Sequence, residues 1–468
     1  MPAKDSWPAG EHPPDILQLM FNAAYVTAGG ELKSMPGKRP LAAQGRAVEP
    51  LEPAELIPLP RGSVLSLLPD RTAVSAQGEL PGFPAAALLP IGYTRTLLPA
   101  YAGYGTLPAL HAGKPAARGD RLPVRAEASS AAYLPLFGYA AVAVRDDGQP
   151  YVAALPTDDP RPWQRRDPGY KQLRRLVKQR LTAASEGVPL LEHLAHCALA
   201  YECRSAQHVF YGGGEGALPS SPVCNAACVG CISDQPDASI QPHERLAFLP
   251  SIDEAVELAV RHLDAAPDAI ISFGQGCEGE PLLNSRNVHI VRRIRQRTSR
   301  GTININTNGS RPKTLRALID AGLGSIRVSM FSAREAVFRR YYRPTGYGLG
   351  EVAECLRVAS TAGLFTSVNL LTFPGITDDG DEVAALIGLY VASGVDLVQL
   401  RNLNIDPEQL LAAFDGMPFA PLGIRRMVAR FHAAGLRTGS YTHTPGPRRQ
   451  PAAAPDALLA GLPSAEWQ

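Results

Sequence analysis

Apolar residues in the second half of the chain form short runs that alternate with amphipathic stretches. Runs typical of buried parallel strands are DAIISFGQG, GTININTNGS, GSIRVSMFS, FTSVNLLTFPG and VDLVQLRNLN. Between these runs, apolar positions recur at helical spacing, which predicts helices over 251–264, 284–298, 311–322, 348–362 and 380–393. Strands separated by single helices indicate βαβ units and a parallel sheet. With one further strand before Cys224, we expect about six βα units, fewer than the eight of a closed barrel.

The first 200 residues have a different pattern, in which prolines interrupt short strand-like runs. The segment GYAAVAVRDDGQPYVAALPTDD predicts a β-hairpin with Asp147 and Gly148 at its turn. Apolar spacing predicts a helix over 171–181 and another through VPLLEHLAHCALAYEC. The expected fold class is therefore α/β, a partial (β/α)6 barrel with a mixed, β-containing N-terminal region. The expected domains are the N-terminal region over 1–200, the partial barrel over 205–440 and a loosely ordered tail over 441–468.

Composition narrows the class of protein further. The 468 residues are 45% hydrophobic and 19% charged, which is typical of a globular chain long enough for two domains. A formal net charge of +2 predicts no general attraction to nucleic acid or to an anionic membrane. No apolar run is long enough to span a bilayer, and the first residues lack the apolar core of a secretory signal. We therefore expect a cytoplasmic protein.

Three of the seven cysteines lie within eight positions of the segment SSPVCNAACVGCIS. A structural zinc site usually has four ligands, often from two C-x-x-C pairs, whereas Cys224, Cys228 and Cys231 supply three. An odd count with one dense cluster does not indicate a disulfide framework. Three thiolates that lack a fourth partner suit an iron–sulfur cluster with one iron open to another ligand.

The other unusual segments follow the predicted strands in turn. GQGCEGEPLL, NTNGS, MFSA, FPGITDD and RNLN each come directly after a strand, and the three-cysteine loop follows the first strand. In parallel βα architectures, ligands bind at the carboxyl ends of the strands. The six loops therefore predict one common site.

The combination of C-x3-C-x2-C after the first strand, Gly-Glu-Pro after the second and Thr-Asn-Gly after the third resembles the radical SAM superfamily. The resemblance covers roughly residues 205–405. It implies that the three cysteines hold a [4Fe–4S] cluster and that the open iron binds S-adenosyl-L-methionine (SAM). It further implies reductive cleavage of SAM to a 5′-deoxyadenosyl radical, which abstracts hydrogen from a substrate.

The resemblance assigns roles to particular residues. The implied metal ligands are Cys224, Cys228 and Cys231, and the implied cofactor-binding residues are Gly279, Glu280, Pro281, Asn308, Ser329, Ser332 and Asn369. Two positions depart from the family pattern. Glu278 stands where the family has the first glycine of Gly-Gly-Glu-Pro, and Gly230 stands where an aromatic residue often precedes the third cysteine.

Simpler interpretations stay open for several of these residues. The cysteines could form a zinc site completed by a distant histidine or by Cys203. Glu280 could cap the helix that begins near Leu282, a role compatible with cofactor binding. Residues 306–308 could serve only as turn residues, and Asn369 could satisfy a backbone group.

The remaining cysteines receive separate interpretations. Cys277 lies inside the loop expected to hold SAM, so it is a candidate catalytic thiol, either as hydrogen donor or as covalent anchor. Cys355 is expected in the core. His193, His196 and Cys197 occupy positions i, i+3 and i+4 of a predicted helix, which can place ligands on one face. Between a second metal site and packing, this spacing favours packing.

The expected substrate is a small molecule or a peptide, and arginines near the site favour an anionic one. Candidate contacts are Gln399, Arg401, Asn402 and Asn404, together with the Arg and Tyr residues of FRRYYRPTGY.

The expected partner is a one-electron reductant such as flavodoxin or ferredoxin. One alternative is an RNA-modifying radical SAM enzyme that uses the basic stretch at 161–181, and another is a non-catalytic metal- or partner-binding module. Multi-cluster peptide maturases of the superfamily carry further cysteines after the barrel, and none follows Cys355 here.

Overall fold

The computed structural model describes residues 21–104, 136–159, 169–184, 188–235, 242–402, 405–442 and 445. These residues form two compact units. Unit 1 comprises 21–90, 95–104 and 139–155, and unit 2 comprises 91–94, 136–138 and the described residues from 156 onward. The sequence placed the boundary near residue 200. The structure places it near residue 156, because the helices at 170–183 and 189–199 pack on the helix at 204–211, which contacts the first strand of the parallel sheet.

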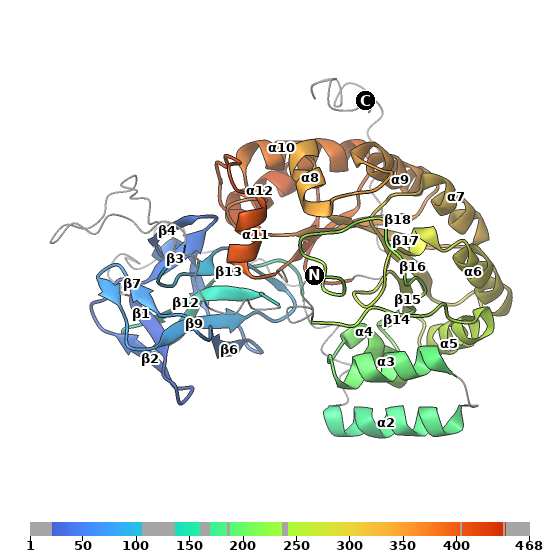
Figure 1. Cartoon of the computed structure of the whole chain (residues 1–468), viewed down its shortest axis with the longest axis horizontal. Helices are drawn as coiled ribbons and strands as arrows, with labels where there is room; N and C mark the ends of the chain where they lie inside the picture. Colours follow the sequence, from blue (N-terminus) through green and yellow to red (C-terminus); the bar gives the residue numbers. More distant parts are fainter. Residues whose placement is uncertain are drawn as a thin grey trace, which may run out of the picture. The chain divides into compact units, whose positions relative to one another are not determined.

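Unit 1 is built from short antiparallel strands (Figure 1). The strands before residue 157 are β1 (Phe21–Val26), β2 (Leu32–Met35), β3 (Leu41–Gln44), β4 (Ala47–Pro50), β5 (Leu56–Pro58), β6 (Val64–Leu67), β7 (Val74–Ser75), β8 (Gly78–Glu79), β9 (Phe83–Leu88), β10 (Tyr93–Arg95), β11 (Leu98–Pro99), β12 (Tyr139–Arg145) and β13 (Pro150–Pro156). The main sheet has the order β13–β12–β1–β9–β6, and a smaller sheet has the order β11–β3–β4. The expected β-containing N-terminal region is confirmed.

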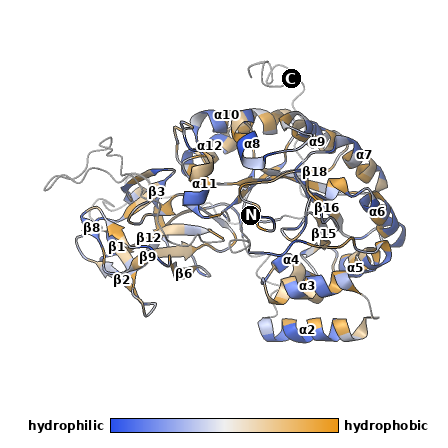
Figure 2. Cartoon of the chain, in the orientation of Figure 1, coloured by the Kyte–Doolittle hydropathy of each residue, from blue (hydrophilic) through white to orange (hydrophobic). Residues whose placement is uncertain are grey.

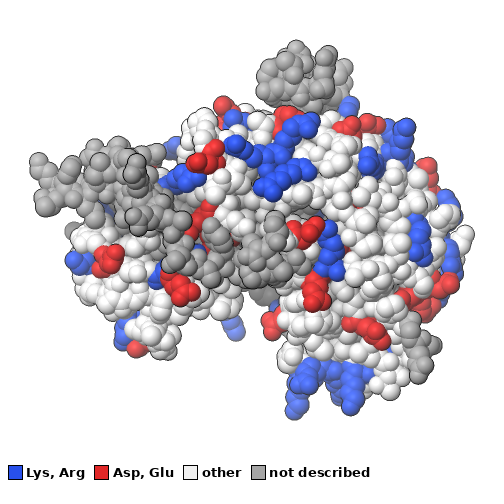
Figure 3. All heavy atoms as spheres, in the orientation of Figure 1, with Lys and Arg blue, Asp and Glu red and all other residues white. Residues whose placement is uncertain are grey.

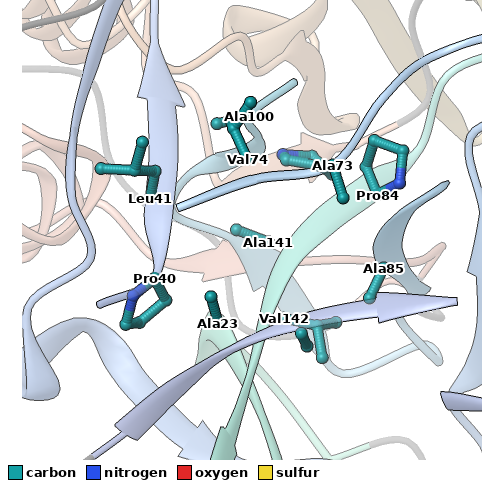
Figure 4. A pocket seen from close by; sticks show the side chains of 12 residues that line it. Ala23, Pro40, Leu41, Ala73, Val74, Pro84, Ala85, Ala100, Ala141 and Val142 are labelled. Atoms are coloured by element: carbon teal, nitrogen blue, oxygen red, sulfur yellow. The ribbon is translucent and has the colours of Figure 1, made fainter. Parts of the chain in front are cut away.

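The predicted hairpin is present as β12 and β13. Its turn is closed by hydrogen bonds from the N–H of Gly148 to the oxygen of Arg145 (2.8 Å) and from the N–H of Arg145 to the oxygen of Gln149 (2.9 Å). Gly148 has a φ of +85°, which glycine adopts without strain. The core of unit 1 is rich in alanine and leaves a cavity of about 20 Å³ (Figure 4). That volume holds about one water molecule, so it is too small for a substrate.

Unit 2 contains a seven-stranded parallel sheet in sequential order. Its strands are β14 (Glu215–Ala217), β15 (Ile270–Phe273), β16 (Thr302–Thr307), β17 (Ser325–Met330), β18 (Phe365–Leu371), β19 (Leu397–Arg401) and β20 (Thr438–Gly439). Each pairs in parallel with the next, as the register of Ser329 with Asn369 and of Asn369 with Gln399 illustrates. The six predicted strands and the partial barrel are confirmed. The seventh strand is only two residues long, too short for a periodic signal.

Helices cover the outer face of this sheet (Figure 1). The helices of unit 2 are α2 (Tyr170–Ala183), α3 (Pro189–Leu199), α4 (Arg204–Tyr211), α5 (Ile252–Ala265), α6 (Arg286–Arg297), α7 (Pro312–Ala321), α8 (Glu335–Tyr342), α9 (Leu349–Thr361), α10 (Gly380–Ala392), α11 (Pro407–Ala413) and α12 (Ile424–Ala433), with the 3-10 turn η4 (Pro281–Leu283). The five helices predicted between strands are confirmed to within two residues at each end. The helix α8 was missed, because Pro344 and Gly346 directly after it indicate a loop.

The ends of these helices follow from local chemistry. The Ser251 side chain accepts a hydrogen bond from the N–H of Glu254 and caps α5. The Asp379 carboxylate accepts from the N–H groups of Asp381 and Glu382 at the start of α10. The helix α7 ends at Gly322, whose φ of +111° is left-handed.

The two faces of the parallel sheet differ in polarity. The outer face packs apolar residues such as Ile305, Val328 and Leu370 against the amphipathic helices, whose hydrophilic residues appear beside apolar ones in Figure 2. The inner face carries Glu215, Asn304, Asn306, Arg327, Ser329, Asn369, Gln399 and Arg401. The concave side of the partial barrel is therefore lined with polar groups.

None of the helices in the described parts of the chain combines the length and apolarity needed to cross a bilayer. The predicted tail over 441–468 lies outside the described residues except at 441, 442 and 445.

Candidate functional site

The six loops singled out in the sequence lie at one edge of the parallel sheet. Because β14 to β19 are parallel neighbours in sequential order, their carboxyl ends form a continuous rim. The three-cysteine loop follows β14, the segment 274–283 follows β15, and 307–310 closes β16. The sheet therefore brings together the segments that the sequence predicted to share a site.

The cysteine loop is held by backbone hydrogen bonds to the end of α8. The N–H of Ala227 donates to the oxygen of Tyr342 (3.0 Å), and the N–H of Val229 donates to the oxygen of Tyr341 (2.8 Å). The N–H of Thr345 in turn donates to the oxygen of Asn225 (2.8 Å). These contacts flank Cys228 on both sides and follow directly after Cys224. The loop is therefore fixed by α8, an element that the sequence did not predict.

The three cysteine thiols suit an iron–sulfur cluster. All three are free and partly buried, so each cysteine keeps some exposure to solvent. Burial raises the pKa of Cys228 well above its usual value, and the neighbouring charges of Cys231 and Cys224 raise it further. A bound cluster would offset this repulsion between the ionised thiols. Because each thiolate of a cluster binds a different iron, the sulfurs need not converge on a single ion.

A cation already lies beside this group. The Nη2 atom of Arg245 donates to the Sγ atom of Cys231 at 3.4 Å, and its Nη1 atom donates to Asp234 at 2.8 Å. The charge of Arg245 opposes the rise that burial causes in the pKa values of Cys224 and Cys228.

Gly230 precedes the third cysteine and has no room for a larger residue. A Cβ atom at this position would lie 2.4 Å from the Oη atom of Tyr341. The buried Tyr341 ring stacks on Phe331, with ring centroids 4.1 Å apart. An aromatic ring thus lies beside the cysteine loop, supplied by α8 rather than by residue 230.

The Gly279-Glu280 segment lies directly against the residues before Cys224. The N–H of Gly279 donates to the oxygen of Ser221 (2.7 Å), and the N–H of Glu280 donates to the oxygen of Val223 (2.8 Å). A Cβ atom at Gly279 would lie 2.0 Å from the Val223 oxygen, so only glycine fits. The expected cluster loop and the expected SAM loop are therefore adjacent backbones.

Glu280 joins three loops through its carboxylate. Its Oε1 atom accepts from the N–H of Leu282 (2.9 Å) and the hydroxyl of Thr307 (2.5 Å), and its Oε2 atom accepts from the N–H of Asn308 (2.7 Å). Burial raises the pKa of Glu280 to about 7. The capping role considered from the sequence is present, since Glu280 caps η4. The contacts to residues 307 and 308 were not predicted.

Glu278, the departure from the family pattern, has a clear structural role. Its buried carboxylate accepts from the N–H groups of Ser220 (2.7 Å), Ser221 (2.9 Å), Gly274 (2.5 Å) and Gln275 (2.8 Å). A glycine could not make these bonds. Burial raises the pKa of Glu278 to about 7, although the four N–H donors oppose that rise. Glu278 therefore links the end of β14 to the loop after β15.

The other predicted cofactor contacts divide into two groups. Asn308 donates to the Oδ1 atom of Asn225 (2.9 Å), beside Cys224, and its own Oδ1 atom accepts from the N–H of Ser310 (3.0 Å). The second bond is the turn chemistry considered above. Ser329 and Asn369 lie side by side in register on the inner face, both partly exposed. Ser332 is fully buried, and its hydroxyl donates to the Glu382 carboxylate (2.6 Å), so its placement favours a structural role.

A buried ion pair on the inner face escaped the sequence analysis. Arg327 donates to the Oε1 atom of Glu215 at 3.0 Å and to the Oδ1 atom of Asn306 at 2.9 Å. Burial tends to raise the pKa of Glu215, but Arg327 and the neighbouring hydroxyl donors hold it at about 2. A charged residue inside an apolar strand, as in GSIRVSMFS, is the signal that could have found Arg327.

Arg401 is the predicted substrate contact that faces the same interior. Its Nε atom donates to Asn369 (3.0 Å), its Nη2 atom to Gln399 (2.8 Å) and its Nη1 atom to the oxygen of Ser440 (2.9 Å). Burial and the charge of Arg327 lower the pKa of Arg401 to about 10, so it stays cationic at neutral pH. These three partners are neutral, and the nearby carboxylates of Glu215 and Asp158 offset part of the positive charge of Arg401.

The other proposed substrate contacts lie elsewhere. Asn402 binds Thr94 (2.8 Å) and the oxygen of Tyr93 (3.2 Å), and Asn404 is outside the described residues. In the FRRYY segment, Tyr341 and Tyr342 are buried beneath the cysteine loop. On the surface of α8, Arg339 of this segment forms an ion pair with Glu335.

Cys277 does not lie among the residues of the rim. Its side chain is 5% exposed, and its Sγ atom lies within 4.8 Å of ligand atoms of Cys197 and His193 on α3. This position does not favour the proposed role as hydrogen donor. Cys355 is fully buried on α9, as expected.

Comparison with known proteins agrees with the motif. Residues 218–387 match the family model described as "Radical SAM superfamily". Two curated relatives, both named GTP 3′,8-cyclase, are similar to part of the chain. The Streptomyces coelicolor protein is 30% identical over 189 residues, 40% of this chain and 52% of its own length. The Limosilactobacillus fermentum protein is 29% identical over 163 residues, 33% of this chain and 45% of its own length. The chain spans about half the length of these curated relatives.

Solved structures give lower similarity. Methylornithine synthase is 15% identical, with 60% of this chain and 86% of that chain covered and a TM-score of 0.33. The FeFe-hydrogenase maturase HydG from Carboxydothermus hydrogenoformans is 14% identical, with 62% and 81% covered and a TM-score of 0.32. The family match confirms the resemblance drawn from the cysteine spacing and, with it, the expected [4Fe–4S] and SAM pair.

Proposed function

The chain belongs to the radical SAM superfamily through residues 218–387, and from this premise we propose an enzyme that abstracts hydrogen from a small anionic substrate. The observation that carries the proposal is the direct contact between the cysteine loop and Gly279-Glu280 at the rim of a polar half-barrel. Family membership supports the initiating chemistry, and the inner face supports the choice of substrate.

The cluster ligands in this proposal are Cys224, Cys228 and Cys231. When bound, the cluster and SAM supply a 5′-deoxyadenosyl radical that removes a hydrogen atom from the substrate. The protein holds the cysteine loop in place through its contacts with α8. It also leaves the fourth ligand position of the cluster without a cysteine. The next cysteine along the chain, Cys277, is turned toward α3 and leaves that position open.

The SAM contacts in this proposal are the Gly279-Glu280-Pro281 segment, Asn308, Ser329 and Asn369. Gly279 lets the backbone approach residues 223 and 224 closely, so a methionine moiety can reach the cluster loop. Glu280 fixes this segment to Asn308 through its carboxylate. Ser329 and Asn369 present polar side chains in register with each other on the inner face.

The substrate anion is assigned to Arg401. Arg327, the other arginine of the inner face, forms a direct ion pair with Glu215. Arg401 donates to neutral oxygens, and the carboxylates of Glu215 and Asp158 act on it only through their charge. An arginine fork held in this way is suited to a carboxylate or phosphate group.

The test is anaerobic reconstitution followed by reduction in the presence of SAM. We expect iron and sulfide in cluster stoichiometry and formation of 5′-deoxyadenosine, with loss of both in Cys224→Ala, Cys228→Ala and Cys231→Ala. Deuterated carboxylates and phosphates are then screened for transfer of deuterium into 5′-deoxyadenosine. A substrate found in this way should lose at least tenfold in kcat/KM with Arg401→Gln and less with Arg401→Lys. The exposed Arg316→Gln is the control, and unchanged turnover by Arg401→Gln would remove the anion assignment.

A purine nucleoside triphosphate is a second candidate substrate. Both curated relatives carry the name GTP 3′,8-cyclase, and a triphosphate matches the cationic Arg401. Incubating the reduced enzyme with SAM and GTP, and analysing the nucleotide by mass spectrometry, separates this candidate from the rest. Unchanged GTP alongside active SAM cleavage would exclude it.

The electron donor we propose is a small one-electron carrier such as flavodoxin or ferredoxin. The cysteine loop is only partly buried, so a docked carrier can approach a cluster bound there closely enough to transfer an electron. Reduced flavodoxin should support SAM cleavage in place of dithionite. The RNA alternative would use α2, on which Lys171, Arg174, Arg175 and Lys178 are exposed. Figure 3 shows Lys and Arg atoms gathered at the lower edge of the molecule, where Figure 1 draws α2. Salt-sensitive retention on tRNA would be needed to support it.

A further inference from the structure

A histidine and two cysteines converge outside the predicted cluster site. His193 and Cys197 lie four residues apart on α3, and Cys277 comes from the loop after β15. One ligand atom from each lies within 4.8 Å of the others, and both cysteines are buried. These are the ligand types that zinc prefers.

We propose that His193, Cys197 and Cys277 form a second metal site that binds a zinc ion. The Cys197 Sγ atom and the His193 Nε2 atom are 3.6 Å apart. In a tetrahedral site with Zn–S near 2.3 Å and Zn–N near 2.05 Å, the two ligand atoms are separated by about 3.6 Å. The pair is therefore already spaced as zinc requires. Three protein ligands leave a fourth position for water.

The Cys197 and Cys277 thiols share a hydrogen bond, which lowers the pKa of Cys197 and raises that of Cys277. His196, the other histidine of this helix, is exposed and packs its ring on Tyr201 with centroids 4.9 Å apart. It therefore belongs to the surface of α3 and not to the proposed site.

The position of the site gives it a structural role. Cys277 is followed directly by Glu278 and Gly279, which hold the segment against the cysteine loop. A metal bound by Cys277 and by two residues of α3 would tie this segment to the helix that precedes the barrel. The inference stands apart from the proposed reaction, because it concerns residues that the reaction does not use.

The experiment uses the full chain with Cys224, Cys228 and Cys231 all changed to alanine, so that the cluster thiols cannot bind the probe. Cobalt(II) replaces zinc and reports thiolate ligation through its charge-transfer band and tetrahedral geometry through strong visible bands. We expect one Co²⁺ per chain, displaced by zinc. Cys197→Ser and Cys277→Ser, each made singly, should reduce the charge-transfer band by at least half. His193→Asn should weaken binding at least tenfold.

Matched control variants distinguish the loss of a metal ligand from a general effect of removing a histidine or a buried thiol. His196→Asn removes a histidine from the same helix, and Cys355→Ser removes a buried thiol on α9, so both should bind Co²⁺ as the parent does. Circular dichroism checks that each variant is folded, and His193→Asn, at a partly exposed position, is the variant least disturbing to the core. The proposal is overturned if folded protein binds no Co²⁺, if His193→Asn binds it unchanged, or if mass analysis of anaerobic protein shows a Cys197–Cys277 disulfide.

Discussion

The backbone at Gly279 lies so close to Val223 that a Cβ atom on Gly279 would be 2.0 Å from the Val223 oxygen. Real side chains do not tolerate that distance from a backbone atom, so one of the two loops must move. These two loops carry the proposed SAM contacts and the first cluster cysteine. The contact therefore couples the cofactor segment to the cluster segment through a position that only glycine can fill.

Gly279→Ala should disturb both loops at once. We expect a loss of about 1–3 kcal/mol in the free energy of unfolding, as for overpacked cores, and iron incorporation well below that of the wild type. Gly388→Ala is the control, because Gly388 is in α10 and a Cβ atom there meets nothing within 4 Å. That variant should be neutral or stabilised by up to about 1 kcal/mol. Equal iron content in both variants would contradict the coupling of the loops.

Gly230 and Tyr341 should show energetic coupling in a double-mutant cycle. A Cβ atom at position 230 meets the Tyr341 Oη atom at 2.4 Å and its Cζ atom at 3.3 Å. Gly230→Ala should therefore destabilise the protein, while Tyr341→Phe removes the nearest atom and relieves most of the clash. We expect a favourable coupling energy of roughly 0.5–3 kcal/mol from chemical denaturation of the four proteins. Additive effects would mean that the loop shifts instead of meeting the ring.

Glu382 should make the protein less stable as the pH rises. It is fully buried in α10, where burial raises the pKa of Glu382 from 4.5 to about 7. The folded state therefore favours the protonated form. Its contribution is complete below pH 4.5 and is lost as the pH rises to about 7. At 1.36 kcal/mol per pKa unit, this shift of about 2.5 units corresponds to roughly 3 kcal/mol.

Glu382→Gln should remove that part of the pH dependence. Gln cannot ionise, and its amide can still bond the Ser332 hydroxyl and the N–H of Ala333, as the carboxyl group does. We compare the free energy of unfolding of wild type and variant between pH 4.5 and 8 in cluster-free protein. Glu278 and Glu280 titrate in both proteins, so the difference between the curves isolates Glu382. The partly exposed Glu354→Gln should follow the wild-type curve, and parallel curves for Glu382→Gln would contradict the prediction.

The sequence predicted the frame of unit 2 well, because its strands and helices have strong and different periods. VDLVQLRNLN, for example, became β19, whose end carries Arg401 at the rim. Helix α8 was missed although Val337, Phe338, Tyr341 and Tyr342 form one apolar stripe. It is only eight residues long, and the proline and glycine that follow it indicate a loop. The error mattered, since α8 holds the cysteine loop.

Long-range contacts were the part that the sequence could not supply. The pattern identified Cys277 as a candidate catalytic thiol, and it separately favoured packing for His193 and Cys197. Only the fold places a loop after β15 against α3 and brings the three side chains together. In the same way, Glu278 departs from the family motif in the sequence. Its structural role is evident only from the four N–H groups of two loops that donate to its carboxylate.

Arg245 should raise the reduction potential of a cluster held by Cys231. Its Nη2 atom lies 3.4 Å from the Cys231 sulfur, and reduction adds negative charge that a nearby cation stabilises. Removing the cation in Arg245→Gln should therefore shift the potential to more negative values. Asp234 pairs with Arg245 at 2.8 Å and offsets part of its charge, so we expect a shift on the order of tens of mV.

The sign of this effect can be checked with its partner. Asp234→Asn removes the offsetting carboxylate and should shift the potential in the positive direction, opposite to Arg245→Gln. Both potentials come from redox titration followed by electron paramagnetic resonance, with the exposed Arg293→Gln as the control. Shifts of the same sign in both variants would mean that solvent access, and not the charge of Arg245, sets the potential. Opposite shifts would place the Arg245 charge within reach of the cluster, which is the arrangement that the Cys231 contact requires.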